Sequence, residues 1–254
     1  MSEVKRPRGR PPKYPPREVE ERLIEASIER LLDNGVDSGL DAIGLDDAIV
    51  SAGVPRGMSY RIWQDGDRAP QDALRHAVVL KLLGLPTTSG LAATKERLAK
   101  ELADITPLID SGDVNDRNRV IAELARVVGS FNHEALDSSP EWRLYNALRA
   151  AAITRRDLDP EIKALIIRGE DLLIERYAEL YSSVAESLGV SLREGLTIEQ
   201  FAASAYALNE GLSGRLTTSY QRDGITRRSG TEDVAEWTLF SVGLEALIRH
   251  FFAV

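Results

Sequence analysis

Cationic and aromatic side chains recur at helical intervals between Val54 and Trp63, where the chain reads Val-Pro-Arg-Gly-Met-Ser-Tyr-Arg-Ile-Trp. Guanidinium, hydroxyl and phenol groups bind phosphate oxygens, and arginine also hydrogen-bonds to base edges in the major groove of DNA. On a helix that turns its apolar residues inward, four side chains would stay outside: Arg56, Ser59, Tyr60 and Arg61. The pattern predicts a surface that contacts nucleic acid.

A second basic segment, residues 1–17, contains five prolines and is expected to be extended. Its core, Arg8-Gly9-Arg10-Pro11-Pro12-Lys13, resembles the AT-hook. Glycine would let the backbone lie deep in a narrow minor groove, while the arginines lie along the floor of that groove in A·T-rich DNA. The alternatives are a solvated tail, a tail that binds phosphates nonspecifically and a nuclear localisation signal. The residues expected to contact DNA are Arg6, Arg8, Gly9, Arg10, Pro11 and Lys13.

Charge is distributed unevenly along the chain. Residues 1–17 carry a net +5, and because the whole chain carries −8, the remainder carries −13. Such a basic arm on an acidic body is informative about partners. The body should repel DNA over most of its surface, so contact should be confined to the arm and a local face beside it.

Two short helices, Leu45–Ala52 and Pro55–Trp63, are expected to position the basic side chains, after a first helix from Val19 to Asn34. Small residues at Ala52 and Gly53 allow the close turn of a helix-turn-helix. The alternative is an unrelated pair of short helices around a glycine turn. The apolar positions expected between the helices are Leu45, Ala48, Ile49, Val54, Met58 and Ile62.

This segment resembles the DNA-binding domain of the TetR family, whose recognition helix has the form Val-Ser-Lys-Gly-Thr-Leu-Tyr-x-Tyr-Phe. Val54, Gly57 and Tyr60 match that form by identity, whereas Pro55 and Gly44 depart from the family pattern. The resemblance implies that Arg56 and Tyr60 contact phosphates and that Met58, Ser59 and Arg61 face the groove. The recognition-helix residues expected to bind DNA are Arg56, Gly57, Met58, Ser59, Tyr60, Arg61 and Trp63.

The rest of the chain has helical spacing and no sustained alternation typical of strands. Cap residues precede proline at Ser139 and Asp159, and Thr197 with Gln200 has the spacing of a capping box. The helices expected are Gln71–Leu83, Thr94–Ile105, Asn118–Phe131, Trp142–Ala152, Pro160–Leu188, Glu199–Leu212 and Asp233–Phe252. The predicted fold is all-α: a flexible arm (1–17), a three-helix helix-turn-helix domain (18–70) and a larger helical domain for effector binding and dimerisation (71–254).

The last two expected helices resemble the pair that forms a four-helix dimer interface in the TetR family. An apolar stripe on a terminal helix needs cover, which favours a homodimer. The alternative is that the stripe belongs to the core of the monomer. The interface residues expected are Phe201, Ala205, Leu208, Leu212, Trp237, Phe240, Leu244, Leu247, Ile248 and Phe251.

The middle helices should line the effector cavity that the resemblance implies. Aromatic residues with a few polar ones suit a small-molecule site, although simple core packing is the alternative. An inward-facing Arg149 would favour an anionic ligand. The lining residues expected are Phe131, Trp142, Tyr145, Asn146, Arg149, Tyr177, Tyr206 and Asn209.

Enzymatic and metal-dependent functions find little support in the sequence. His76, His133 and His250 are scattered, and cysteine is absent. No glycine-rich phosphate loop follows a strand. Apolar runs such as Ala77–Leu83 are too short to cross a bilayer. We expect no catalytic residues, no metal and no cofactor, and a cytoplasmic protein associated with the bacterial nucleoid.

The sequence thus predicts a homodimeric transcriptional regulator, a repressor by the family's default. Its partner would be a palindromic DNA operator with an A·T-rich flank, and a small-molecule effector would release it. The alternative is a helical interaction protein whose arm binds nucleic acid nonspecifically.

Overall fold

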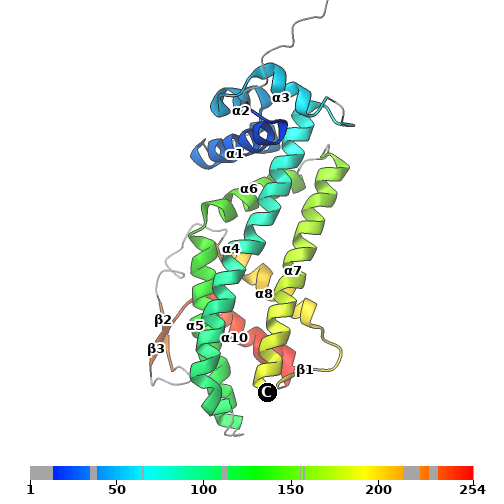
Figure 1. Ribbon diagram of the computed structural model, residues 1–254. Helices are drawn as coiled ribbons and strands as arrows, with labels where there is room; N and C mark the ends of the chain where they lie inside the picture. The colour runs from blue at the N-terminus through cyan, green and yellow to red at the C-terminus, as the bar shows by residue number, and fades with distance from the viewer. Residues whose placement is uncertain are drawn as a thin grey trace, which may run out of the picture. The chain divides into compact units, whose positions relative to one another are not determined.

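The computed structural model describes residues 14–34, 39–64, 66–109, 114–154, 156, 158–213, 224–228 and 234–253. Most of this length is helical, which confirms the all-α class (Figure 1). The chain divides into two compact units between Lys81 and Leu82. The predicted minor-groove residues, from Arg6 to Lys13, lie outside the described residues.

The first unit contains a small bundle of short helices. An apolar face on each helix meets in one core, in which Val19, Leu23 and Leu74 are fully buried. The helix α1 packs against both α2 and α3. The elements are α1 (Pro16–Asn34), the 3₁₀ turn η1 (Gly39–Ala42), α2 (Leu45–Ala52), α3 (Arg56–Ile62) and the beginning of α4 (Pro70–Ile109).

The second unit contains the longer helices, and α10 packs against both α5 and α8. Two short antiparallel strand pairs, β1 with β4 and β2 with β3, were not expected from the sequence. Ile225 is opposite Trp237 in the second pair. The elements are the rest of α4, then α5 (Val114–Asp137), α6 (Pro140–Thr154), α7 (Pro160–Leu188), β1 (Ser191–Leu192), α8 (Ile198–Ser213), β2 (Ile225–Arg227), β3 (Ala235–Trp237), α10 (Leu239–Phe251) and β4 (Phe252–Ala253).

The predicted helix caps are present. The Asp159 carboxylate accepts a hydrogen bond from Glu161 N at 2.8 Å, and Ser139 Oγ accepts one from Trp142 N at 3.1 Å. The capping box is reciprocal, because Thr197 N donates to Gln200 Oε1 at 3.0 Å and Gln200 N donates to Thr197 Oγ1 at 3.2 Å. These bonds satisfy amides that the first turn of a helix leaves without partners, so helix starts could be read from sequence.

The helix prediction is wrong in two places, which involve three of the expected helices. The interval predicted as Asp233–Phe252 contains β3, and α10 begins only at Leu239. Ala235 and Trp237 are buried while Glu236 is exposed, which is the two-residue period of a strand. Thr238 then starts α10 by accepting a hydrogen bond from Ser241 N at 3.0 Å. The second error is α4, which continues through Gly84 and Pro86 where the sequence predicts two separate helices.

No helix in the described ranges combines the length and the hydropathy required to cross a membrane.

Candidate nucleic-acid interface and ligand cavity

A left-handed glycine joins the two short helices of the first unit. Gly53 follows α2 with φ 61° and ψ 32°, and its N–H donates to the carbonyls of Ile49 and Val50. A side chain is strained in this conformation, so glycine suits the position. Val54 then enters the core, and α3 begins at Arg56 after the extended Pro55. The expected two-helix geometry is therefore present.

The outer face of α3 carries most of the residues predicted to bind DNA. Arg56, Gly57, Tyr60 and Arg61 are exposed, while Met58 and Trp63 are half-buried. Ser59 is fully buried, and its hydroxyl donates to the Pro55 carbonyl at 3.2 Å. The expectation that Ser59 lies outside is wrong. A serine is small enough for the core, and the carbonyl four residues earlier satisfies its hydroxyl.

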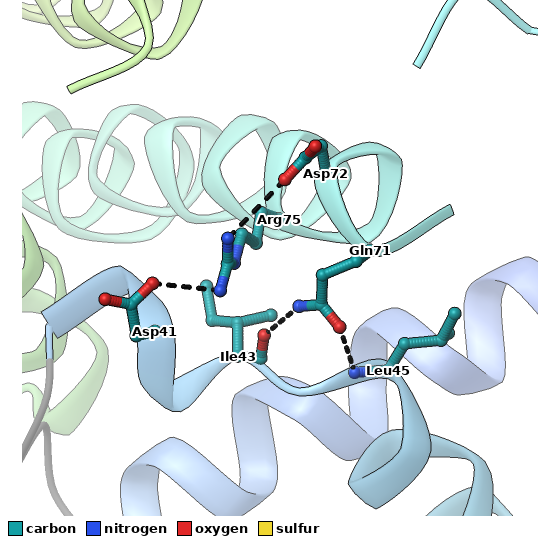
Figure 2. Close-up of polar contacts among 6 residues, drawn as sticks. All are labelled: Asp41, Ile43, Leu45, Gln71, Asp72 and Arg75. Atoms are coloured by element: carbon teal, nitrogen blue, oxygen red, sulfur yellow. Dashed lines mark hydrogen bonds and ion pairs between the residues drawn. The ribbon is translucent and has the colours of Figure 1, made fainter. Parts of the chain in front are cut away.

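The start of α2 is held by side chains from α4 (Figure 2). Gly44 precedes α2 and has no side chain to cap it. Instead, Leu45 N donates to Gln71 Oε1 at 2.8 Å, and Gln71 Nε2 donates to the Ile43 carbonyl. Four residues further along α4, Arg75 pairs with Asp41 at 2.9 Å. Gln71 was not predicted from the sequence. The one available signal was that Gly44 has no side chain to accept a hydrogen bond, so the amides at the start of α2 need a distant acceptor.

One carboxylate at the start of α2 binds two of the exposed residues of α3. Arg56 Nη2 lies 3.0 Å from Asp46 Oδ1, and Tyr60 Oη donates to the same oxygen at 3.1 Å. The Arg56 guanidinium also lies 5.6 Å from the centre of the Tyr60 ring. The hydrogen bond with Tyr60 and the charge of Asp46 raise the pKa of Arg56. The two predicted phosphate ligands are therefore already engaged with an anion.

The adjacent Asp47 makes a different contact. Its carboxylate pairs with Arg30 of α1 at 3.1 Å. Over residues 39–64 the chain has three aspartates and two arginines, a net charge of −1. Each of the three aspartates is paired with an arginine: Asp41 with Arg75, Asp46 with Arg56 and Asp47 with Arg30.

The predicted dimer stripe lies largely inside the second unit. Phe240 is 1% exposed and Phe201 is 2% exposed. The Phe201 ring lies 5.4 Å from Phe251 and 5.2 Å from Phe252, centre to centre. A Cβ on Gly243 would fall 2.6 Å from Leu208 Cδ2, so α8 and α10 are in close contact within one chain.

For the stripe residues that are buried in the single chain, the structure fits the monomer-core alternative, and a dimer interface at the rest of the stripe stays a prediction. Apolar side chains gain the same free energy from burial in their own chain as in a partner. The stripe residues buried in the single chain are Phe201, Ala205, Trp237, Phe240, Leu244 and Phe251. The half-buried ones are Leu208, Leu212, Leu247 and Ile248.

A narrow apolar cavity lies between α4, α5, α7, α8 and α10 in the second unit. Its empty volume is about 750 Å³, part of which is open to solvent. Its walls are mainly aliphatic, with Leu98, Leu124, Val128 and Leu180 among them. A site of this kind suits an apolar ligand with few polar groups.

Polar groups are gathered at one place on the cavity wall. Asn132 Oδ1 accepts hydrogen bonds from Thr94 Oγ1 at 3.1 Å and from Tyr177 Oη at 3.2 Å. All three residues are buried and line the cavity. Burial raises the pKa of Tyr177 to about 12, so its hydroxyl keeps its proton at neutral pH. The cluster is a neutral hydrogen-bonding site in an otherwise apolar wall.

Of the predicted effector residues, Tyr177 alone lines this cavity. Trp142 packs against Tyr145 in a tilted arrangement and against Tyr206 edge-on, at 5.7 Å and 5.8 Å between ring centres. Arg149 binds Glu170 and Glu210 and is not available to an anionic ligand. The predicted residues outside the cavity are Phe131, Trp142, Tyr145, Asn146, Arg149, Tyr206 and Asn209. Aromatic and polar side chains also pair with one another in a core, as Trp142 and Arg149 do here, so the effector role of these residues stays a prediction.

Known proteins offer no match to this chain, whether as family models, as curated proteins or as solved structures. The resemblance of residues 19–63 to the TetR family consequently stays a prediction that rests on the sequence of this segment. Within the described ranges, no group of three or more His, Asp or Glu side chains is arranged to hold a metal ion.

Proposed function

We propose that this chain is a sequence-specific DNA-binding transcriptional regulator that resembles the TetR family, and not an enzyme. The observation that carries the proposal is the outer face of α3. A seven-residue helix, held on a core by α1 and a glycine turn, presents Arg56, Tyr60 and Arg61 outward. Short helices of this kind enter the major groove, where arginine reads guanine and binds phosphate.

Gly57 supports the same proposal. It is exposed on α3, and a Cβ built there would meet nothing within 4 Å. Packing within the protein therefore does not require glycine at this position. Close approach of the helix to a sugar-phosphate backbone would require it, because any larger side chain would hold the two surfaces apart.

We further propose that the regulator is a homodimer that represses transcription from a palindromic operator with an A·T-rich flank. Helix-turn-helix proteins reach two half-sites one helical turn apart through two-fold symmetry. The basic arm would add minor-groove contacts at the flank. The proposed setting is the bacterial cytoplasm, with the protein on the nucleoid.

The apolar cavity is the proposed effector site. Its aliphatic walls and the neutral Asn132 cluster favour an uncharged ligand with an unbranched hydrocarbon chain and one hydrogen-bonding end. Straight-chain alcohols of increasing length provide the test, because a real cavity raises the melting temperature up to a limiting chain length. Val128→Trp, which places a large ring on the cavity wall, should abolish that rise. A rise that continues without limit, or that survives this substitution, would assign the binding to another surface.

Selection from random duplex DNA tests the proposed function directly. Full-length protein should enrich a palindromic consensus with A·T-rich flanks, and protein lacking residues 1–17 should keep the palindrome but lose the flank preference. The variant Arg56→Ala/Tyr60→Ala/Arg61→Ala should enrich nothing, while circular dichroism shows that its helices remain. Its matched control is Lys163→Ala/Arg168→Ala/Arg176→Ala on α7, which removes three exposed cations outside both α3 and the arm.

A full-length protein that binds DNA without any consensus, and only through its arm, would contradict the proposal. That result would favour the helical interaction protein whose arm binds nucleic acid nonspecifically. Sedimentation of the protein–DNA complex gives the stoichiometry, and one chain per operator would remove the homodimer from the proposal.

A further inference from the structure

The Asp46 carboxylate contacts both residues of α3 that are predicted to bind phosphate, Arg56 and Tyr60. Arg56 Nη2 lies 3.0 Å from Oδ1 and 3.1 Å from Oδ2 of this carboxylate, so the guanidinium nitrogen is shared between the two oxygens. The Tyr60 hydroxyl donates to Oδ1 at 3.1 Å. Two side chains that are separated by one helical turn on α3 thus converge on a single anion at the start of α2.

A carboxylate and a backbone phosphate present the same chemistry to these donors. Each offers two anionic oxygens that accept charge-assisted hydrogen bonds from a guanidinium and a hydroxyl. Arg56 and Tyr60 cannot direct the same N–H and O–H groups to Asp46 and to a phosphate together. The Asp46 charge also lies where it would repel an approaching phosphate.

We propose that Asp46 is an intramolecular competitor of DNA phosphate, which weakens binding by the recognition helix and sets the affinity of the regulator for its operator. This inference rests on the proposed DNA-binding function. In free protein, the carboxylate holds Arg56 and Tyr60. On DNA, a phosphate replaces it, and Asp46 is left without these partners.

The size of the effect follows from exposure. The side chains of Arg56 and Asp46 are 67% and 61% exposed, so water weakens the pair that a phosphate must displace. Loss of the competitor should therefore tighten operator binding by about 2- to 5-fold, and not by several orders of magnitude.

Asp47 provides a matched control. It lies in the first turn of α2 beside Asp46, so substitution of either residue removes one negative charge from the same turn. Its carboxylate pairs with Arg30 of α1, whereas that of Asp46 pairs with Arg56 of α3. A general electrostatic effect should appear in both variants, whereas competition for Arg56 and Tyr60 should appear only in the Asp46 variant.

The experiment measures the affinity of full-length wild-type protein, Asp46→Asn and Asp47→Asn for the selected operator by fluorescence anisotropy over a range of salt concentrations. We expect Asp46→Asn to bind about 2- to 5-fold tighter and Asp47→Asn to change by less than about 1.5-fold. In an Arg56→Ala/Tyr60→Phe background, the gain from Asp46→Asn should disappear, as a double-mutant cycle requires. Thermal melts establish that both asparagine variants are folded.

Equal tightening by the two asparagine variants would overturn the inference, because it would reduce the effect to net charge. Weaker binding by Asp46→Asn would also overturn it, by showing that Asp46 holds Arg56 and Tyr60 in the geometry that DNA requires. Either result leaves the proposed function standing, since both require an operator that the wild-type protein selects. If no operator is selected, the proposed function fails and the inference fails with it.

Discussion

The outer face of α3 and the apolar stripe of α8 and α10 were both predicted from the sequence to contact a partner. In the structure the two regions differ in exposure. Arg56, Tyr60 and Arg61 on α3 are exposed, whereas Phe201 and Phe240 on the stripe are buried in their own chain. The predicted contact residues are therefore exposed in the first region, whereas most of those in the second region are already covered within their own chain.

The difference lies in what each residue type requires. A guanidinium costs several kcal/mol to bury without a partner, so arginines on a short helix indicate an outer surface wherever the rest of the chain lies. A phenylalanine needs only to leave water, and a neighbouring helix serves as well as a second subunit. Charged residues on a helix thus indicate which face is exposed. An apolar stripe indicates only that the face is buried, and not whether its own chain or a partner buries it.

The largest effect that would distinguish the two regions is expected at Phe240. Phe240→Ala should lower the free energy of unfolding by about 3–5 kcal/mol, because a buried aromatic ring is replaced by a cavity. Urea denaturation of the protein without DNA measures this loss. If the residue served mainly a dimer interface, the substitution would instead lower the sedimentation coefficient and leave the stability of the monomer nearly unchanged. Ala246→Ser, on the exposed side of α10, is the control.

Arg61 should give the next largest effect, and on binding alone. It is exposed on α3 and lies on the face predicted to enter the groove. Arg61→Ala should weaken operator binding by about 1–3 kcal/mol and relax the preference at one base position. Competition between the operator and single-base variants measures both quantities. Arg61→Lys keeps the charge but not the two-pronged geometry, so a lysine variant with full specificity would contradict base reading by this residue.

Local rules account for what the sequence could predict. The caps at Asp159 and Thr197 and the glycine turn at Gly53 depend on residues close together in the chain, and all were identified. Contacts between distant segments were not. Gln71 reaches the Leu45 amide across 26 positions, and no feature near Gln71 marks it as a cap.

The predicted lining residues of the ligand site differ from those of the observed cavity for a related reason. Aromatic residues such as Trp142 and Tyr206 were candidates because of their type, yet they pack on each other. Most residues that line the cavity are leucine, isoleucine, valine or alanine, which are indistinguishable in sequence from ordinary core residues. Only the arrangement of five helices shows which of these residues leave space between them.

Gln71 should give a smaller effect that links the exposed face of α3 to the core beneath it. Gln71→Ala removes both hydrogen bonds at the start of α2. The free energy required to open that helix locally should therefore fall by about 1–2 kcal/mol. Hydrogen exchange at the Leu45 amide measures this change. Gln71→Glu keeps the acceptor for Leu45 N and loses the donor to the Ile43 carbonyl, so its effect should be intermediate. Unchanged protection in Gln71→Ala would show that α2 does not depend on α4 for its cap.

The smallest effect at neutral pH is expected from Tyr177, on the buried side of the comparison. Burial raises its pKa to about 12, against about 10 in an unfolded chain. Between pH 10 and pH 12 the unfolded state releases this proton and the folded state retains it, so the free energy of unfolding should fall as pH rises through that window. Below pH 10 both states keep the proton and the contribution is constant. Urea denaturation at pH 8, 10 and 11 should therefore show a decline that is less steep in Tyr177→Phe. The same slope in both proteins would mean that the Tyr177 hydroxyl is as accessible to water as an exposed residue, and that the cavity wall around Asn132 is open.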